Sequence, residues 1–195
     1  MDELRRLQSE LSSGGSACFP YNIFLIGFMG SGKSTISACL SRAFSMEAVE
    51  MDRLIVKREG MSISDIFAVH GEEYFRGLET GLLTELLEKQ NVVVSCGGGV
   101  PMRTINVAKM KENGRVVLLS ATPETILERV KNSHDRPLLE GHKEVSYISE
   151  LMEKRRPKYE AAADITVVTD KKSEREICAE LVRKLLEMDK KKEGD

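Results

Sequence analysis

The sequence has little that would cross-link a chain or bind a structural metal. It contains no tryptophan, only three histidines and four cysteines among 195 residues, and 5% aromatic residues. No two cysteines have the C-x-x-C spacing that gathers a zinc ion, because they lie far apart at Cys18, Cys39, Cys96 and Cys178. These absences exclude a disulfide-dense scaffold and a cysteine-rich zinc module, and they favour reduced thiols.

Long apolar runs and an excess of one charge are also missing. No run approaches the ~18 apolar residues of a membrane span, and the acidic residues Asp2 and Glu3 replace the basic region of a signal peptide. Lys and Arg total 29 against 31 Asp and Glu, which gives a net charge of -2 and favours neither nucleic acid nor a membrane as a partner. We expect a cytoplasmic monomer with small-molecule partners.

The composition that remains is that of one ordinary globular domain, with 41% hydrophobic and 31% charged residues. Its ends differ from its middle. Residues 1–20 place leucines at helical spacing before a Ser/Gly-rich stretch, which predicts a short amphipathic helix and a flexible linker, a frayed N-terminal extension. Residues 189–195 form a charged, solvated tail. The domain proper is expected over 21–188.

Within this domain, short apolar runs alternate with helical patterns. Runs with little alternation, typical of strands buried on both faces of a parallel sheet, occupy residues 22–28, 92–96, 116–119 and 165–168. Residues 48–51 are a weaker strand candidate. Apolar residues recur at helical spacing over 72–88, 122–130 and 174–186. The order predicts an α/β domain with a parallel sheet flanked by helices.

The first chemical signal is GFMGSGKS at 27–34, which matches G-x-x-x-x-G-K-[ST] between a predicted strand and a helical pattern. Glycines let the backbone N–H groups curl around phosphate oxygens at a helix N-terminus. Lys33 would supply a positive charge to the β and γ phosphates, and Ser34 would ligate Mg²⁺. The alternative is a glycine-rich turn with a surface lysine. We interpret the segment as a nucleoside triphosphate site.

Further candidates come later in the chain. Asp52 follows the second predicted strand, where residues face the ligand crevice of an open α/β sheet, although it could instead cap a helix at 53–58. Arg76 belongs to a helical segment and could be a solvated helix charge. Three glycines at 97–99 follow a strand and would let a ligand approach the backbone, or simply form a sharp loop.

Two arginine sites flank a polar stretch at 140–149. They are DRPLL, with Arg136, and LMEKRRPKY, with Arg155. Such a stretch can be a mobile lid, and a guanidinium fork matches phosphate or carboxylate, although any basic cluster can be solvated.

In this order, GFMGSGKS, the Asp52 region, SISDIFAVHGEEYFR, VSCGGGV, DRPLL and LMEKRRPKY resemble the shikimate kinase family over about residues 21–186. The resemblance implies a P-loop fold of the nucleoside-monophosphate-kinase type, with a five-stranded parallel sheet, a substrate-binding helical region at about 52–80 and a lid at about 137–149. It implies transfer of the γ-phosphoryl group of ATP to the 3-hydroxyl of shikimate in aromatic amino-acid biosynthesis.

The resemblance also assigns roles residue by residue. The catalytic residues would be Lys33, Asp52 and Arg136. The ATP site would comprise Gly30, Ser31, Gly32, Lys33, Ser34, Thr35, Arg129, Arg136 and Lys172, with Ser34 also on Mg²⁺. The shikimate site would comprise Asp52, Arg76, Gly98, Gly99 and Arg155.

Two positions depart from the family pattern. Glu50-Met51-Asp52 replaces the usual D-x-D pair, which puts the first carboxylate's water-mediated metal contact in doubt, and Lys171-Lys172 replaces a late arginine near adenine. Competing functions are a gluconate kinase or nucleoside monophosphate kinase, and a regulatory homologue whose kinase activity has decayed. An ADP-release assay with and without shikimate separates them.

Overall fold

The computed structural model describes residues 3–13, 19–131 and 144–193, and its centre is a five-stranded parallel sheet. The strand order is β2-β3-β1-β4-β5, which confirms the predicted sheet. The strands are β1 (Asn22–Ile26), β2 (Glu47–Glu50), β3 (Val92–Ser95), β4 (Gly114–Ser120) and β5 (Ile165–Val168). Every residue of the central strand β1 is buried. Its run therefore shows no polar alternation, because both faces are covered.

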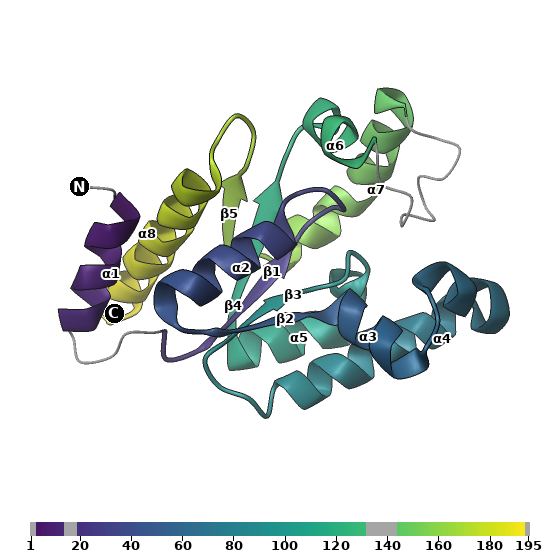
Figure 1. Ribbon diagram of the computed structural model, residues 1–195, viewed down its shortest axis with the longest axis horizontal. Coiled ribbons are helices and arrows are strands. Elements are labelled where there is room, and N and C mark those ends of the chain that lie inside the picture. The colour runs from purple at the N-terminus through teal and green to yellow at the C-terminus, as the bar shows by residue number, and fades with distance from the viewer. Residues whose placement is uncertain (1–2, 14–18, 132–143, 194–195) are drawn as a thin grey trace.

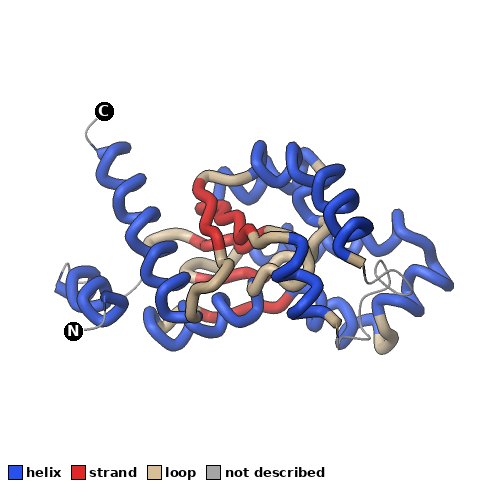
Figure 2. Tube along the Cα trace, turned by 90° about the horizontal axis from the view of Figure 1, so that it is seen from above, coloured by secondary structure: helices blue, strands red, loops and turns tan. Residues whose placement is uncertain are grey.

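Helices cover both faces of the sheet (Figures 1 and 2). One face carries α1 (Glu3–Ser13), α2 (Lys33–Phe44) and α8 (Glu174–Glu193). The other carries α3 (Met51–Glu59), α4 (Ile63–Leu86), α5 (Thr104–Asn113) and α7 (Val145–Ala162), with the 3-10 helix η1 (Val100–Met102) before α5. The helix α6 (Pro123–Val130) packs against α7 in a smaller third cluster.

Several helices differ from their predicted bounds. The predicted helix at 72–88 is the second part of α4, which begins at Ile63 and breaks at Gly71, where φ is 82° and ψ is 170°. Glycine adopts this backbone conformation without strain. The helices α5 and α7 were not predicted from the sequence. Part of the expected lid at 137–149 belongs to α7, which begins at Val145, and residues 137–143 lie outside the described residues.

Both ends of the chain make more contacts than the sequence suggested. The helix α1 packs against α8 instead of fraying, and Leu4 and Leu7 are buried in the same cluster as α2. The predicted tail at 189–195 partly continues α8, where Asp189 pairs with Arg115 at 3.0 Å and accepts a hydrogen bond from Tyr21. Over residues 3–13, 19–131 and 144–193, no helix is long and apolar enough to cross a membrane.

Candidate active site

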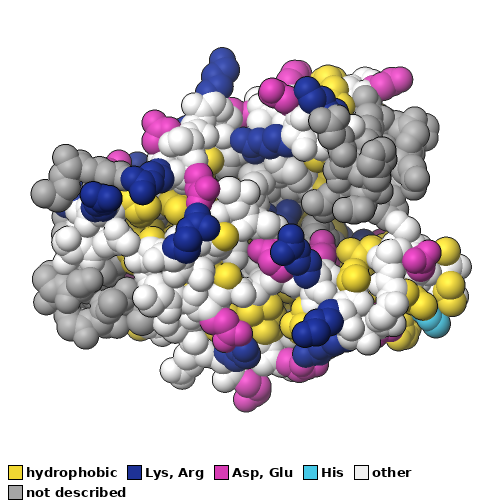
Figure 3. Space-filling view, in the orientation of Figure 1, with side chains coloured by type: hydrophobic (Ala, Val, Ile, Leu, Met, Phe, Trp, Pro, Cys, Tyr) yellow, Lys and Arg dark blue, Asp and Glu magenta, His cyan; other side chains and the backbone are white. Residues whose placement is uncertain are grey.

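A cleft of about 1180 Å³ lies along the carboxyl ends of the strands, where ligands bind in open α/β sheets. It runs from the β1–α2 loop, past β2 and α3, to α4, the triglycine turn and α7. In the view of Figure 3, side chains of both charges surround a hollow in the middle of the molecule. Its lining includes every predicted site residue that the structure describes: Gly30, Ser31, Gly32, Lys33, Ser34, Thr35, Asp52, Arg76, Gly98, Gly99, Arg129, Arg155 and Lys172.

The loop between β1 and α2 requires glycine at three positions. Gly27, Gly30 and Gly32 have φ values of 142°, 76° and 100°, which other residues rarely adopt. A Cβ atom on Gly27 would lie 2.4 Å from the carbonyl oxygen of Leu119. Gly32 caps α2 without a side-chain hydrogen bond, so the first N–H groups of the helix face the cleft as donors for an anion. The alternative of an ordinary surface turn does not explain this geometry.

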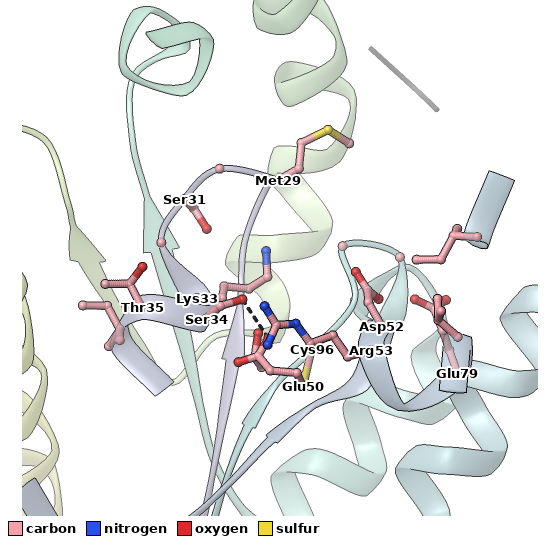
Figure 4. A pocket seen from close by; sticks show the side chains of 18 of the residues that line it. Met29, Ser31, Lys33, Ser34, Thr35, Glu50, Asp52, Arg53, Glu79 and Cys96 are labelled. Carbon is pink, nitrogen blue, oxygen red and sulfur yellow. Dashed lines mark hydrogen bonds between the residues drawn. The ribbon is translucent and has the colours of Figure 1, made fainter. Parts of the chain in front are cut away.

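Lys33 and Ser34 point into the cleft from the start of α2 (Figure 4). The Lys33 ammonium donates to the carbonyl oxygens of Gly27 at 2.9 Å and Phe28 at 3.1 Å, which holds it at the phosphate loop. Ser34 Oγ donates to Glu50 Oε2 at 2.7 Å. The departure at Glu50 therefore keeps a carboxylate beside Ser34, and hydroxyl and carboxylate oxygens are the donors that Mg²⁺ prefers.

Asp52 belongs to the first turn of α3 and faces the cleft. The residue that caps this helix is Glu50, so the alternative that Asp52 is a helix N-cap is wrong. Its Oδ1 atom would lie 2.8 Å from a Cβ atom built on Gly97, and Oε1 of Glu79 would lie 2.4 Å from the same atom. The absence of a side chain at Gly97 therefore makes room for the carboxyl groups of Asp52 and Glu79 in this part of the cleft.

Arg76 is held between two carboxylates of its own helix. Its Nη1 donates to Glu79 at 2.6 Å, and its Nε and Nη2 donate to Glu72 at 3.1 and 2.7 Å. The side chain is 12% exposed, so the alternative of a solvated helix charge is wrong. Burial acts to lower the pKa of Arg76, but Glu79 and Glu72 raise it overall. The guanidinium stays charged at the cleft wall.

Glu79 is the functional candidate that the sequence analysis missed. Its side chain is 1% exposed, and its Oε1 atom has no hydrogen-bond partner among the described residues. Burial raises the pKa of Glu79 to about 7, against the lowering effect of Arg76. A signal was available, because Glu79 is a charged residue three positions after Arg76 on the buried stripe of its helix.

The three glycines after β3 form a turn that ends in η1. The N–H of Val100 donates to the carbonyl oxygen of Gly97 at 3.1 Å, and the N–H groups of Gly98 and Gly99 have no acceptor in the described part of the chain. A Cβ atom on Gly99 would lie 1.8 Å from Arg76 Nη1, and one on Gly98 would lie 3.7 Å from Arg155 Nη1. Backbone donors and two guanidinium groups therefore converge at one end of the cleft.

The neighbours of Arg155 on α7 face solvent instead. Lys154 and Arg156 are mostly exposed and pair with carboxylates of their own helix. Of the three basic residues at 154–156, only Arg155 lines the cleft.

Of the remaining candidates, Arg129 and Lys172 line the cleft, and Arg136 lies outside the described residues. Arg129 donates to the carbonyl oxygens of Gly30 at 3.2 Å and Thr169 at 3.1 Å, which ties α6 to the phosphate loop. Lys172 pairs with Glu180 at 2.6 Å. Arg136 lies outside the described residues, so the structure does not place it.

This arrangement defines a class of enzyme. A phosphate-binding loop opens one end of the cleft, and a carboxylate with two guanidinium groups lies at the other. The sheet order and the loop are those of a P-loop fold, and the cleft extends from this loop to the two guanidinium groups. The fold and the site together are those of an ATP-dependent small-molecule kinase.

Comparisons with known proteins identify the family. The shikimate kinase family profile matches residues 29–186. Shikimate kinase of Persephonella marina is 44% identical over 164 residues, which cover 84% of this chain and 98% of the relative. The chain belongs to the shikimate kinase family, whose members are ATP-dependent kinases of aromatic amino-acid biosynthesis.

Solved structures agree with this assignment. Shikimate kinase from Acinetobacter baumannii in complex with shikimate has a TM-score of 0.82 at 31% identity, covering 86% of this chain and 94% of that chain. Shikimate kinase from Aquifex aeolicus has a TM-score of 0.73 at 42% identity, covering 84% and 95%.

Proposed function

We propose that the cleft binds ATP at the β1–α2 loop and shikimate at the triglycine turn, and that the chain transfers the γ-phosphoryl group to the 3-hydroxyl of shikimate. The observation that carries this proposal is the convergence of Arg76, Arg155 and the Gly98 and Gly99 N–H groups at one end of a cleft that begins at Lys33. A carboxylate without partners would be costly to bury, and guanidinium forks match its planar shape.

The acceptor geometry follows from that anchor. With the carboxylate of shikimate on Arg76 and Arg155, the ring hydroxyls lie towards Asp52, on the side of the phosphate loop. Asp52 accepts a hydrogen bond from the attacking hydroxyl, orients it and takes its proton late, because a loose phosphoryl-transfer transition state demands little early deprotonation. Lys33 and the loop N–H groups neutralise charge on the transferring group. Arg136 is assigned the same task from the family resemblance.

Mg²⁺ has suitable donors in this cleft, because Ser34 and Glu50 present oxygen atoms beside the phosphate loop. When bound, the ion would neutralise negative charge on the nucleotide phosphates. Among the described residues, no group of three His, Cys, Asp or Glu side chains could hold a metal ion. Arg129 and Lys172 are assigned to the adenine end, beside α8.

The test is an assay of ADP release with ATP and Mg²⁺, with and without shikimate, and with the product identified by ³¹P NMR. We expect ADP formation to require shikimate and Mg²⁺ together, since the site should turn over only when the acceptor hydroxyl is in place. A phosphate monoester at the 3-position is the expected product. Equal ADP release without shikimate contradicts the proposal, and no release under any condition indicates the decayed regulatory homologue. The monomeric state and the cytoplasmic location stay predictions.

A further inference from the structure

Tyr159 belongs to the RRPKY segment but does not line the cleft. Its side chain is 4% exposed and packs behind the triglycine turn, one helical turn after Arg155 on α7. The phenol Oη donates to the carbonyl oxygen of Gly98 at 2.7 Å. Burial raises the pKa of Tyr159, against the lowering effect of Arg155, so the phenol remains protonated and continues to donate.

This hydrogen bond fixes the direction of the next N–H group. In a trans peptide, the carbonyl of one residue and the N–H of the following residue point in opposite directions. Because the Gly98 carbonyl points to Tyr159, the Gly99 N–H points away from α7. Gly98 and Gly99 line the cleft, and this N–H has no acceptor among the described residues.

The turn has a second conformation available. It is closed by the hydrogen bond from Val100 N–H to the Gly97 carbonyl oxygen, and Gly99 has φ −92° and ψ −15°, the values for the third residue of a type I turn. A flip of the Gly98–Gly99 peptide would give a type II turn, which needs positive φ at its third residue. Glycine accepts positive φ at little cost, so the backbone alone selects weakly between the two turns.

We propose that Tyr159 is a positioning residue that holds the Gly98–Gly99 peptide with its N–H towards the substrate carboxylate and couples this donor to Arg155. A Cβ atom on Gly98 would lie 3.6 Å from Tyr159 Oη and 3.7 Å from Arg155 Nη1, so both side chains of α7 meet the same peptide. The inference rests on the proposed function, because it takes shikimate as the ligand of this donor set.

The test is Tyr159→Phe, which removes one hydroxyl and keeps the ring that packs in the core. We expect the KM for shikimate to rise on the order of tenfold, because one fixed donor is lost. The kcat and the KM for ATP should change less than about twofold. A merely structural role would instead lower the melting temperature and the active fraction, and would leave the KM for shikimate unchanged.

Lys158→Met is the matched control. Lys158 also ties α7 to the turn region, through a hydrogen bond from its Nζ to the Met102 carbonyl oxygen at 3.0 Å, but it lies outside the cleft. We expect its KM for shikimate to match that of the parent. A rise equal to that of Tyr159→Phe would mean that loosening α7 explains the effect, and would overturn the proposal.

Two further results separate this inference from the proposed function. In the ¹⁵N-labelled parent protein, addition of shikimate should shift the Gly99 amide resonance, and an unmoved resonance overturns the role of Tyr159 even if the variant does not fold. If Arg155→Lys raises the KM for shikimate while Tyr159→Phe does not, the site assignment stands and the positioning role fails. If neither variant affects that KM, the proposed acceptor site itself is wrong.

Discussion

The two ends of the cleft are built in different ways. At the nucleotide end, the phosphate loop is one continuous segment in which Lys33 and Ser34 follow the glycines directly, and Glu50, Arg129 and Lys172 join it from other parts of the chain. The acceptor end is assembled from separate elements that meet only in the fold: Asp52 from α3, Arg76 and Glu79 from α4, Gly98 and Gly99 from the turn, and Arg155 from α7. Backbone N–H groups dominate the first end, and buried or half-buried charges dominate the second.

This difference has an energetic consequence. The phosphate loop alone positions the backbone N–H donors at the nucleotide end, and most side chains of this loop are accessible to solvent. At the acceptor end, Arg76 and Glu79 are removed from water and depend on each other, because an uncompensated buried charge is strongly destabilising. Substitutions at the nucleotide end should therefore affect turnover, and those at the acceptor end should affect recognition and its dependence on pH.

The largest expected effect is that of Lys33→Ala. Removing the ammonium takes away a charge aimed at the phosphates, so we expect kcat to fall by at least about a hundredfold. The fold should persist, because Lys33 is only half-buried and its ammonium donates to the loop carbonyls of Gly27 and Phe28. Coupled ADP-release kinetics measure the loss, and thermal unfolding of the same preparation is the control. A variant that retains kcat would remove Lys33 from the machinery.

Arg76→Lys and Arg155→Lys test the acceptor end. Each variant keeps the positive charge but loses the forked donor geometry, so the KM for shikimate should rise by about tenfold to a hundredfold, from roughly 1.5 to 3 kcal/mol per charge-assisted contact. The KM for ATP should stay near that of the parent. Separate titrations of shikimate and ATP measure both values. An equal loss of ATP binding would show that the two ends are not independent.

The pH dependence should be confined to the acceptor end. Glu79 is faced by Arg76, Asp52 and Arg103, and its pKa is raised from an ordinary value of 4.5 to about 7. As the pH falls below about 7, protonation of Glu79 weakens its ion pair with Arg76, and the KM for shikimate should rise by about fivefold. Glu79→Gln should show a raised KM that no longer changes with pH, while the KM for ATP follows the parent. A parent KM that is constant down to about pH 5.5 would exclude this role.

Glu79 also affects how the free energy of unfolding changes with pH. Because the folded protein holds this proton more tightly than the unfolded chain, the contribution of Glu79 to the free energy of unfolding decreases as the pH rises from about 4.5 to about 7. Glu79→Gln should remove that decrease. Urea unfolding across this range measures it.

The smallest expected effect is that of Glu50→Asp. The shorter carboxylate lengthens the 2.7 Å contact with Ser34, but a contact through metal-bound water absorbs about 1 Å of reach. The Mg²⁺ concentration needed for half-maximal rate should change by less than about tenfold. A larger change would mean that Glu50 binds the metal directly. Glu47→Asp is a matched control on the same strand, because Glu47 pairs with Lys89 away from the cleft.

The sequence predicted the phosphate loop of the cleft more directly than the acceptor end. The glycine pattern at 27–34 predicted the phosphate loop, because each of these glycines occupies a position with positive φ, and the residue type alone indicates such a position. Arg76 and Asp52 line the cleft, but taken alone Arg76 could be a solvated helix charge and Asp52 a helix N-cap, so the family resemblance was needed to single them out. Glu79 lies on the buried stripe of α4 three positions after Arg76, but its position beside Gly97 depends on how α4 packs in the fold. The helices α5 and α7 were missed because their apolar faces are weakly periodic.

The parallel sheet, the phosphate loop and the family could therefore be deduced from patterns in the chain. Apolar runs and glycine positions act within a few residues, so their consequences can be deduced without the fold. Three contacts became visible only in the folded chain: α1 packs on α8, Glu79 is buried against Arg76, and Tyr159 donates to the Gly98 carbonyl oxygen. These contacts join residues that are far apart in the sequence or buried by other elements. Their exposure, charge and orientation depend on which side chains pack beside them, and this is known only once the chain is folded.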